Sequence, residues 1–219
     1  MKISFRKFLI KVSFLFFLAF LIQGCAAGNV YKLSGVKATL QASPPKDNRV
    51  AVATLDKRDV IVSKRCPPTY IGMQRGGFGN PFRVNTASGL PLSDDVTKAV
   101  SESLAIRGYR AIPVTVAYDL TEQKVKELLI QKEADRSIFV MIKQWESDTL
   151  TNIGLTYDMS LMVFGPNQAL LAETSVADTK NISGSFLNPS AAAKEKVPEA
   201  FRAVLEALLN SPKVIAALQ

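Results

Sequence analysis

The side chains that most often carry catalysis or hold metals are scarce in this chain. It contains no histidine, which removes Ser-His-Asp and Cys-His catalysis, histidine-ligated zinc and a histidine pH switch. Its two cysteines, Cys25 and Cys66, are too few for a thiolate cluster around a metal. We therefore expect no metal and no cofactor. The remaining groups that could do chemistry are the two thiols, a few grouped carboxylates and a run of basic side chains.

The carboxylates have a simpler explanation than catalysis. Ser93-Asp94-Asp95 stands at the start of a predicted helix, where a polar cap and acidic residues favour the helix dipole. Glu122 and Glu127 lie on a second predicted helix among alternating lysines, which is typical of a solvated face. The sequence thus names no acid–base pair, and we predict that the protein is not an enzyme.

Cys25 follows a segment with the three parts of a secretory signal. The segment has a basic start, an almost wholly apolar run over residues 12–22, and a small residue, Gly24, before the expected cleavage point. The basic start comprises Lys2, Arg6, Lys7 and Lys11. The apolar run is shorter than the roughly 20 residues that a transmembrane helix needs. We therefore predict that residues 1–24 are a signal peptide.

The four residues Ile22-Gln23-Gly24-Cys25 resemble the lipobox of bacterial lipoproteins, in which an aliphatic residue, any residue and Gly or Ala precede the cysteine. This resemblance implies cleavage after Gly24, a diacylglycerol on the Cys25 thiol and a fatty acid such as palmitate on the new amine. Burial of acyl chains at about 0.8 kcal/mol per CH₂ would hold the protein stably on a membrane. Ala26 is not the Asp that retains lipoproteins at the inner membrane, so the resemblance implies the outer membrane, facing the periplasm. The alternatives are an uncleaved anchor and a secreted protein with a coincidental cysteine.

Loss of the signal peptide changes the charge and the cysteine count. Residues 1–24 contain four basic and no acidic side chains, so the net charge falls from +8 to +4. Without a recognisable nucleic-acid module, this charge does not indicate a nucleic-acid partner. If Cys25 carries lipid, Cys66 has no partner in the chain. Cys66 is then a free thiol, a bridge between chains, or a small buried apolar residue.

Residues 56–90 concentrate basic side chains among glycines and prolines. The segment contains six basic and two acidic residues, and its turn-forming residues predict a long loop. Long loops in a compact domain are often functional, and Arg75-Gly76-Gly77-Phe78-Gly79-Asn80 has the composition of an anion-binding turn. The alternative is a solvated or oligomer-forming loop. The candidate contacts for a partner or an anion are Arg58, Lys64, Arg65, Arg75 and Arg83.

The rest of the chain predicts one domain of mixed composition. Residues 25–47, the lipidated N-terminus included, are small, polar or turn-forming in part and predict a flexible tether, with a short strand within 30–40 as an alternative. Residues 48–219 predict a single periplasmic domain. Helices are expected at 92–108, 120–134, 190–196, 198–209 and after Pro212, and strands at 49–55, 109–116, 136–146, 155–164 and 169–179. This order predicts an α+β fold, with one mixed, largely antiparallel sheet of four to five strands and helices mainly on one face.

From Ser93 onward the order of elements resembles the YajG-type bacterial lipoproteins, a family of unassigned activity, and more loosely other periplasmic lipoproteins. The resemblance is carried by 104–109 at the end of a helix, by 134–140 continuing to Trp145, by the strand over 152–163, and by the last helix with Phe201. It covers about the last 125 residues and the lipobox. It implies a fold and a cellular place, with no catalytic residues to carry over.

Three functions are compatible with these features. The first is a non-enzymatic cell-envelope lipoprotein that binds a protein complex, peptidoglycan or anionic lipid head groups through the basic loop. The second is a structural, homo-oligomeric subunit of an envelope assembly, with the loop or a sheet edge, and Cys66, between chains. The third is a histidine-independent hydrolase of envelope material, for which the sequence provides no motif.

Overall fold

The sheet is organised around its longest strand, β6 (Arg136–Thr149). The computed structural model describes residues 29–46 and 48–219, so the predicted signal peptide, Gly24 and Cys25 lie outside the described residues. One edge of β6 pairs along its whole length with β7 (Ile153–Phe164), antiparallel. Its other edge is shared, because the first half pairs with β2 (Arg49–Asp56) and the second half with β3 (Tyr70–Arg75), both parallel. The sheet therefore branches at β6.

Eight strands make up this sheet in the described part of the chain. Beyond β2 lies β5 (Arg110–Val114), beyond β3 lie β4 (Pro81–Thr86) and then β1 (Asn29–Tyr31), and beyond β7 lies β8 (Leu170–Ile182). Four pairings are parallel and three antiparallel. The mixed α+β fold is confirmed, whereas four to five strands is wrong because segments that were expected to be irregular supply β1, β3 and β4.

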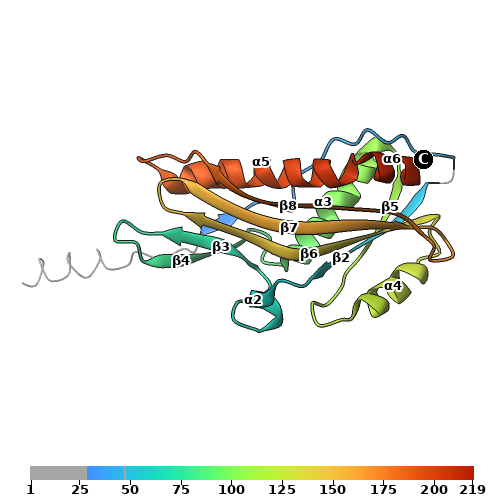
Figure 1. Cartoon of the computed structure of the whole chain (residues 1–219), viewed down its shortest axis with the longest axis horizontal. Helices are drawn as coiled ribbons and strands as arrows, with labels where there is room; N and C mark the ends of the chain where they lie inside the picture. The colour runs from blue at the N-terminus through green and yellow to red at the C-terminus, as the bar shows by residue number, and fades with distance from the viewer. Residues whose placement is uncertain (1–28, 47) are drawn as a thin grey trace, which may run out of the picture.

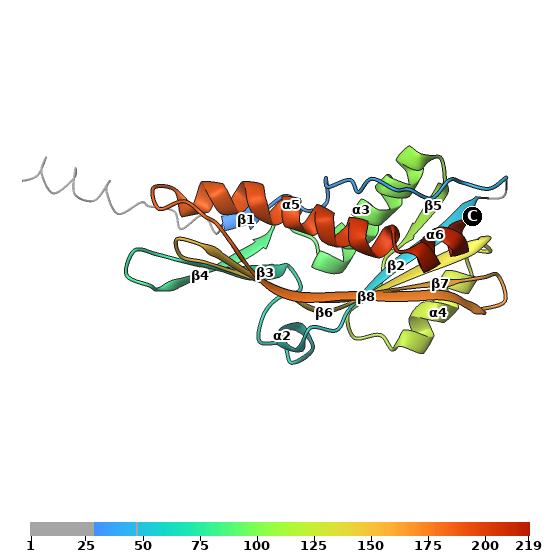
Figure 2. The ribbon, with the colours of Figure 1, turned by 45° about the horizontal axis from the view of Figure 1, so that its top comes forward.

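Most of the helices cover one face of the sheet. The larger core lies between that face and α3 (Leu92–Arg107), α5 (Pro189–Leu209) and α6 (Pro212–Leu218) (Figures 1 and 2). A smaller core on the opposite face is covered by α4 (Glu122–Ile130). The alternating residues of β7 from Leu155 to Val163 all face the larger core, as their period of two predicts. The prediction of helices mainly on one face is thus confirmed.

Local end signals define the helices. Gly108 ends α3 with a φ of 103°, which a glycine adopts without a Cβ clash. The hydroxyl of Thr121 accepts a hydrogen bond from the Lys124 amide, and the side chain of Asn188 accepts one from the Ala191 amide. The expected break at Pro198 is absent, and α5 is continuous through it. The single helix forms because Phe201 and its apolar neighbours on both sides of the proline pack on the sheet.

Residues 29–46 do not form the predicted flexible tether. β1 adds to the sheet edge beside β4, and five apolar residues are buried in the larger core, namely Tyr31, Leu33, Ala38, Leu40 and Ala42. The backbone amide of Ala38 donates to Ser103 Oγ at 2.8 Å, and that of Thr39 donates to Glu206 Oε1 at 2.9 Å. Helices α3 and α5 thus hold a segment whose own sequence shows no regular period.

Residues 56–90 are likewise not one long loop. The short helix α2 (Asp59–Val62) forms near the start of this segment, and β3 and β4 form a hairpin with Gly76–Asn80 as its turn. Gly72 in β3 has a φ of 155° at a bulge, and a Cβ there would overlap the backbone of Ser147 on β6. Gly72 therefore allows β3 to approach β6 closely, and it marks a bulge in a strand and not a turn in a loop.

Candidate functional site

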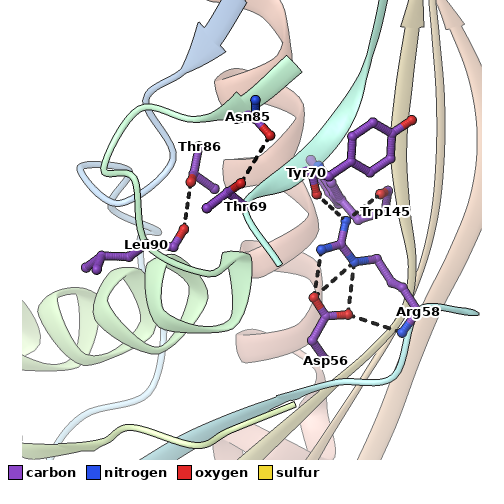
Figure 3. A network of polar contacts seen from close by, with 8 residues as sticks. All are labelled: Asp56, Arg58, Thr69, Tyr70, Asn85, Thr86, Leu90 and Trp145. Carbon is purple, nitrogen blue, oxygen red and sulfur yellow. Dashed lines mark hydrogen bonds and ion pairs between the residues drawn. The ribbon is translucent and has the colours of Figure 1, made fainter. Parts of the chain in front are cut away.

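Arg58 is a buried structural residue and not a surface contact. Its side chain is 2% exposed and pairs with Asp56, which is fully buried, with Nη2 donating to Asp56 Oδ2 at 2.6 Å (Figure 3). Nη1 donates to the carbonyl oxygens of Tyr70 at 2.6 Å and Trp145 at 3.2 Å. Arg58 therefore joins the end of β2 to β3 and β6, and its predicted role as a partner contact is wrong.

Neighbouring polar contacts also hold the 56–90 segment in place. Thr69 Oγ1 donates to Asn85 Oδ1 at 3.1 Å, and Thr86 Oγ1 donates to the Leu90 carbonyl at 2.6 Å (Figure 3). The Tyr70 hydroxyl donates to Glu146 Oε1 at 2.6 Å. Burial, together with this carboxylate, raises the pKa of Tyr70 above its usual range. Tyr70 is thus a neutral donor at physiological pH and serves packing.

The other predicted basic contacts separate into two places. Lys64 and Arg65 are exposed just after α2, where Arg65 pairs with Asp59. On the hairpin, Arg75 pairs with Asp148 of β6 at 2.5 Å, and Arg83 is exposed on β4. α2 and the hairpin are separate in Figure 1. The structure therefore does not bring the five basic residues together into one surface.

Neither the predicted anion-binding turn nor the second cysteine forms a reactive site. Within the hairpin turn, the amides of Gly76 and Gly79 donate to the Asn80 and Gly76 carbonyl oxygens at 2.9 and 2.8 Å, so they are not directed at a ligand. Cys66 is a half-buried free cysteine beside α2. Its backbone amide donates to the Val60 carbonyl at 2.9 Å. Cys66 remains a candidate free thiol, because it forms no disulfide among the described residues.

A pocket of about 330 Å³ lies where α4 ends, β6 begins and β7 turns into β8. We call it the distal pocket. Its apolar surface comes mainly from Leu129, Ile130, Ala134 and Phe164, and its polar lining from Lys126, Glu133, Asp135, Ser137 and Gln168. This combination of an apolar floor with a few polar groups is typical of binding sites of this size.

Two strained backbone positions line the distal pocket. Glu133 has a φ of 49° and Gln168 a φ of 61°, and Lys64 is the third residue other than glycine with positive φ in the described chain. Such left-handed conformations are uncommon outside glycine and cluster at functional sites. Both residues are in tight turns, with their amides bonded to the carbonyl oxygens of Ile130 and Gly165. The turns direct two long polar side chains to one site.

The distal pocket places one ammonium, two carboxylates and an amide beside its apolar residues. The Lys126 ammonium lies 5.3 Å from the centre of the Phe164 ring, a cation–π distance. Asp135 Oδ2 accepts a hydrogen bond from the Arg49 backbone amide at 2.8 Å, so it is already in use. The Glu133 carboxylate and the Gln168 amide remain for a ligand. The pocket lining contains no histidine or cysteine.

No sequence pattern indicates this pocket. The alternating charges of the α4 segment predict a solvated face. The one local signal among the pocket residues is that positions 133 and 168 are polar. Their positive φ values cannot be predicted from the sequence, because the fold determines them. That these two turns meet depends on the pairing of Ser137 with Phe164, which no local pattern shows.

No protein-family model matches the sequence, and no curated protein matches it either. Among solved structures, protein XCC0632 of Xanthomonas campestris, of the DUF330 family, is similar to this chain with a TM-score of 0.49 and 14% identity, over 86% of this chain and 96% of that one. The PelC dodecamer of Paraburkholderia phytofirmans is similar with a TM-score of 0.40 and 12% identity, over 80% of this chain and 96% of that one. Lipoprotein GNA1162 of Neisseria meningitidis is similar with a TM-score of 0.30 and 11% identity, over 75% of this chain and 99% of that one.

These similarities do not establish a family for the chain, the YajG-type one included. The similar structures include one bacterial lipoprotein and one dodecamer. Separately, none of the helices in residues 29–46 and 48–219 is long and apolar enough to cross a membrane.

Proposed function

We propose that the protein is a lipid-anchored, non-enzymatic lipoprotein of the bacterial outer membrane, facing the periplasm, that binds another envelope component through the distal pocket. The observation that carries the binding role is the pocket itself, with its apolar floor and two strained polar residues. The anchor rests on the lipobox ending at Cys25. This places binding in a part of the chain other than the basic 56–90 segment.

Among envelope components, the distal pocket favours a protein. An apolar floor of leucine, isoleucine and phenylalanine is complementary to an apolar side chain, whereas glycan strands and head groups offer mainly polar surface. Lys126 and Glu133 at the pocket provide one charge of each sign. The partner expected from this chemistry presents an apolar side chain with flanking polar groups.

Site-specific photo-cross-linking in intact cells tests this function. A photoreactive residue replaces Ile130 in the pocket lining or, as a matched control, Ile106 on α3, which is exposed and outside the lining. We expect one discrete protein adduct from position 130, none from 106, and loss of the adduct when Glu133→Lys is added. Equal adducts from both positions, or no adduct from 130, would contradict the proposal.

A homo-oligomeric subunit is the second candidate, and the free edge of β8 favours it. β8 is 13 residues long and pairs only with β7 within the described chain. Long unpaired edges readily add a further strand from another chain. Light scattering on the purified protein should show one defined assembly that Ser175→Lys with Ala177→Lys dissociates. A monomeric wild-type protein would exclude this candidate, and non-reducing electrophoresis would reveal a bridge through Cys66.

A further inference from the structure

Three loops lie at one end of the molecule. β3 runs parallel to the second half of β6, with Gly72 beside Ser147, so the β3–β4 turn and the β6–β7 turn point past the same end of the sheet. β8 ends at Ile182 opposite Ile153, which brings the loop over 183–188 there as well. Figures 1 and 2 show this end, with the hairpin and the loop before α5 extending beyond the sheet. The distal pocket lies at the other end of β7.

Two of these loops also contact each other. The Gly184 amide donates to Asn152 Oδ1 at 3.3 Å. The backbone of Gly184 is so close to Thr151 that a Cβ at this position would overlap the Thr151 carbonyl oxygen. The loop over 183–188 is therefore held against the β6–β7 turn.

Three large apolar side chains at this end are almost fully exposed. Phe78 in the hairpin turn is 103% exposed, Phe186 is 85% and Leu187 is 93%. The next most exposed large hydrophobic side chain among the described residues, Ile106, is at 66%. We call Phe78, Phe186 and Leu187 the apolar tips. Apolar groups gathered on projecting loops mark a contact with a protein or a membrane.

The predicted anchor reaches the same end. Asn29 pairs with Val84, three residues from Pro81 at the start of β4, a separation of roughly 10 Å along the strand. Asn29 Oδ1 also accepts a hydrogen bond from Ser190 Oγ at 2.9 Å, near the end of the loop over 183–188. Cys25 precedes Asn29 by four residues, which span at most roughly 14 Å. The attachment point of a lipid on Cys25 therefore lies within that distance of Asn29, which leaves the apolar tips within its reach.

We propose that the apolar tips enter the head-group and acyl boundary of the membrane that holds the lipid on Cys25, so that the domain stands end-on with the distal pocket directed away from the bilayer. Phenylalanine and leucine on one side of a polar surface enter this boundary readily. Exposed Arg83 on β4 lies behind the hairpin turn, where its guanidinium can meet lipid phosphate groups. This inference rests on the lipid anchor of the proposed function, and it does not depend on what the pocket binds.

Depth-dependent fluorescence quenching tests the proposal in the full-length, cell-processed protein. The protein is purified from membranes and placed in vesicles of phosphatidylethanolamine and phosphatidylglycerol with brominated acyl chains. Trp145, the single tryptophan, is 1% exposed and is kept in all variants, so the wild type gives the baseline. Phe186→Trp and Phe78→Trp probe the apolar tips, and Leu170→Trp is the control at the other end of the sheet, where Leu170 is exposed.

We expect the added fluorescence of Phe186→Trp and Phe78→Trp to fall about two-fold in brominated vesicles, because the boundary is within reach of the bromines. The added fluorescence of Leu170→Trp should not change. Equal quenching of tip and control variants, or none at the tips in protein that stays with the vesicles, overturns the proposal and indicates a protein contact for the tips. Protein recovered from the soluble fraction of cells overturns the lipid anchor itself, which distinguishes the two failures. Because the two tip positions lie in different loops, poor folding of one variant leaves the other informative.

Discussion

At the scale of single residues, Arg58 makes five side-chain hydrogen bonds inside the protein, three to Asp56 and two to backbone carbonyl oxygens of β3 and β6. A buried ion pair adds little net stability over apolar packing, because both charges lose water on burial. Removal of one partner is costly, because the other charge stays buried alone. Arg58 thus fixes the position of the 56–90 segment on the sheet.

We expect Arg58→Met to lower the free energy of unfolding by about 3–5 kcal/mol, because Asp56 is then left without its counter-ion. Urea denaturation monitored by circular dichroism measures the change. The matched control is Arg83→Met, an exposed arginine of the same segment, which should change stability by no more than about 0.5 kcal/mol. Similar small effects for both variants would mean that the Asp56–Arg58 pair does not hold the segment.

Asp95 provides a second residue-scale test, through pH. It is 1% exposed, its Oδ2 has no hydrogen-bond partner, and burial raises its pKa above the ordinary value of 3.8. The folded protein therefore holds this proton more tightly than the unfolded chain does. The resulting stability is present below the unfolded-state pKa and is lost as pH rises through the folded-state pKa.

We therefore expect Asp95→Asn to stabilise the protein at pH 7 by about 1 kcal/mol, the scale of one unpaired buried polar group. The gain should shrink as the pH falls below 3.8, where Asp95 becomes protonated in both states. Urea denaturation midpoints at several pH values measure this gain in stability. Glu102→Gln, on the same helix, is the control. A gain that does not depend on pH would show that the charge of Asp95 is not its cause.

At the scale of elements, local signals were sufficient wherever an element defines its own ends. α3 ends at Gly108 as expected, α4 and α6 begin close to their expected starts, and β7 has its predicted inward face. However, α3 begins without a side-chain cap, and α4 ends at Ile130 instead of 134. Local signals were insufficient where a strand forms only because a neighbouring element lies beside it. β1 exists because β4 and α5 lie beside it, and β3 because β6 accepts its bulge. The prediction of Arg58 as a partner contact was wrong for the same reason, because composition shows the charge of a residue but not its burial.

Helix α5 gives an element-scale prediction, because it continues through Pro198. Pro198 has no N–H for the carbonyl oxygen of Lys194, and an interior proline costs about 3 kcal/mol. Replacing the proline also gives the unfolded chain more freedom, which offsets up to about 1 kcal/mol of the expected gain in stability. We expect Pro198→Ala to raise the free energy of unfolding by about 2 kcal/mol.

The matched control for Pro198→Ala is Pro189→Ala in the first turn of the same helix. An N–H at this position has no partner within the helix, so the replacement should change stability by less than about 1 kcal/mol. Urea denaturation compares the two variants. A loss of stability in Pro198→Ala would show that the α5 axis needs its proline to follow the sheet.

At the scale of the whole molecule, the branched sheet places two surface features at opposite ends of one direction. β6 and β7 run the length of the domain, with the apolar tips beyond one end and the distal pocket at the other. The net charge of the sequence showed none of this polarity, because the basic residues are divided between an internal ion pair, α2 and the hairpin. A whole-molecule arrangement follows from strand pairing over long separations, and such pairing leaves no trace in local patterns.

The N-terminal segment decides whether that direction is fixed relative to the anchor. If residues 29–46 are part of the larger core, as Leu33 with 0% exposure indicates, then Leu33→Ala should lower the free energy of unfolding by about 2–5 kcal/mol through lost burial and a cavity. The exposed neighbour Lys37→Ala should change it by no more than about 0.5 kcal/mol. Urea denaturation of the full chain measures both. A flexible tether would make the two substitutions equally neutral. The domain could then turn freely above the membrane, and neither end would have a fixed orientation towards the lipid.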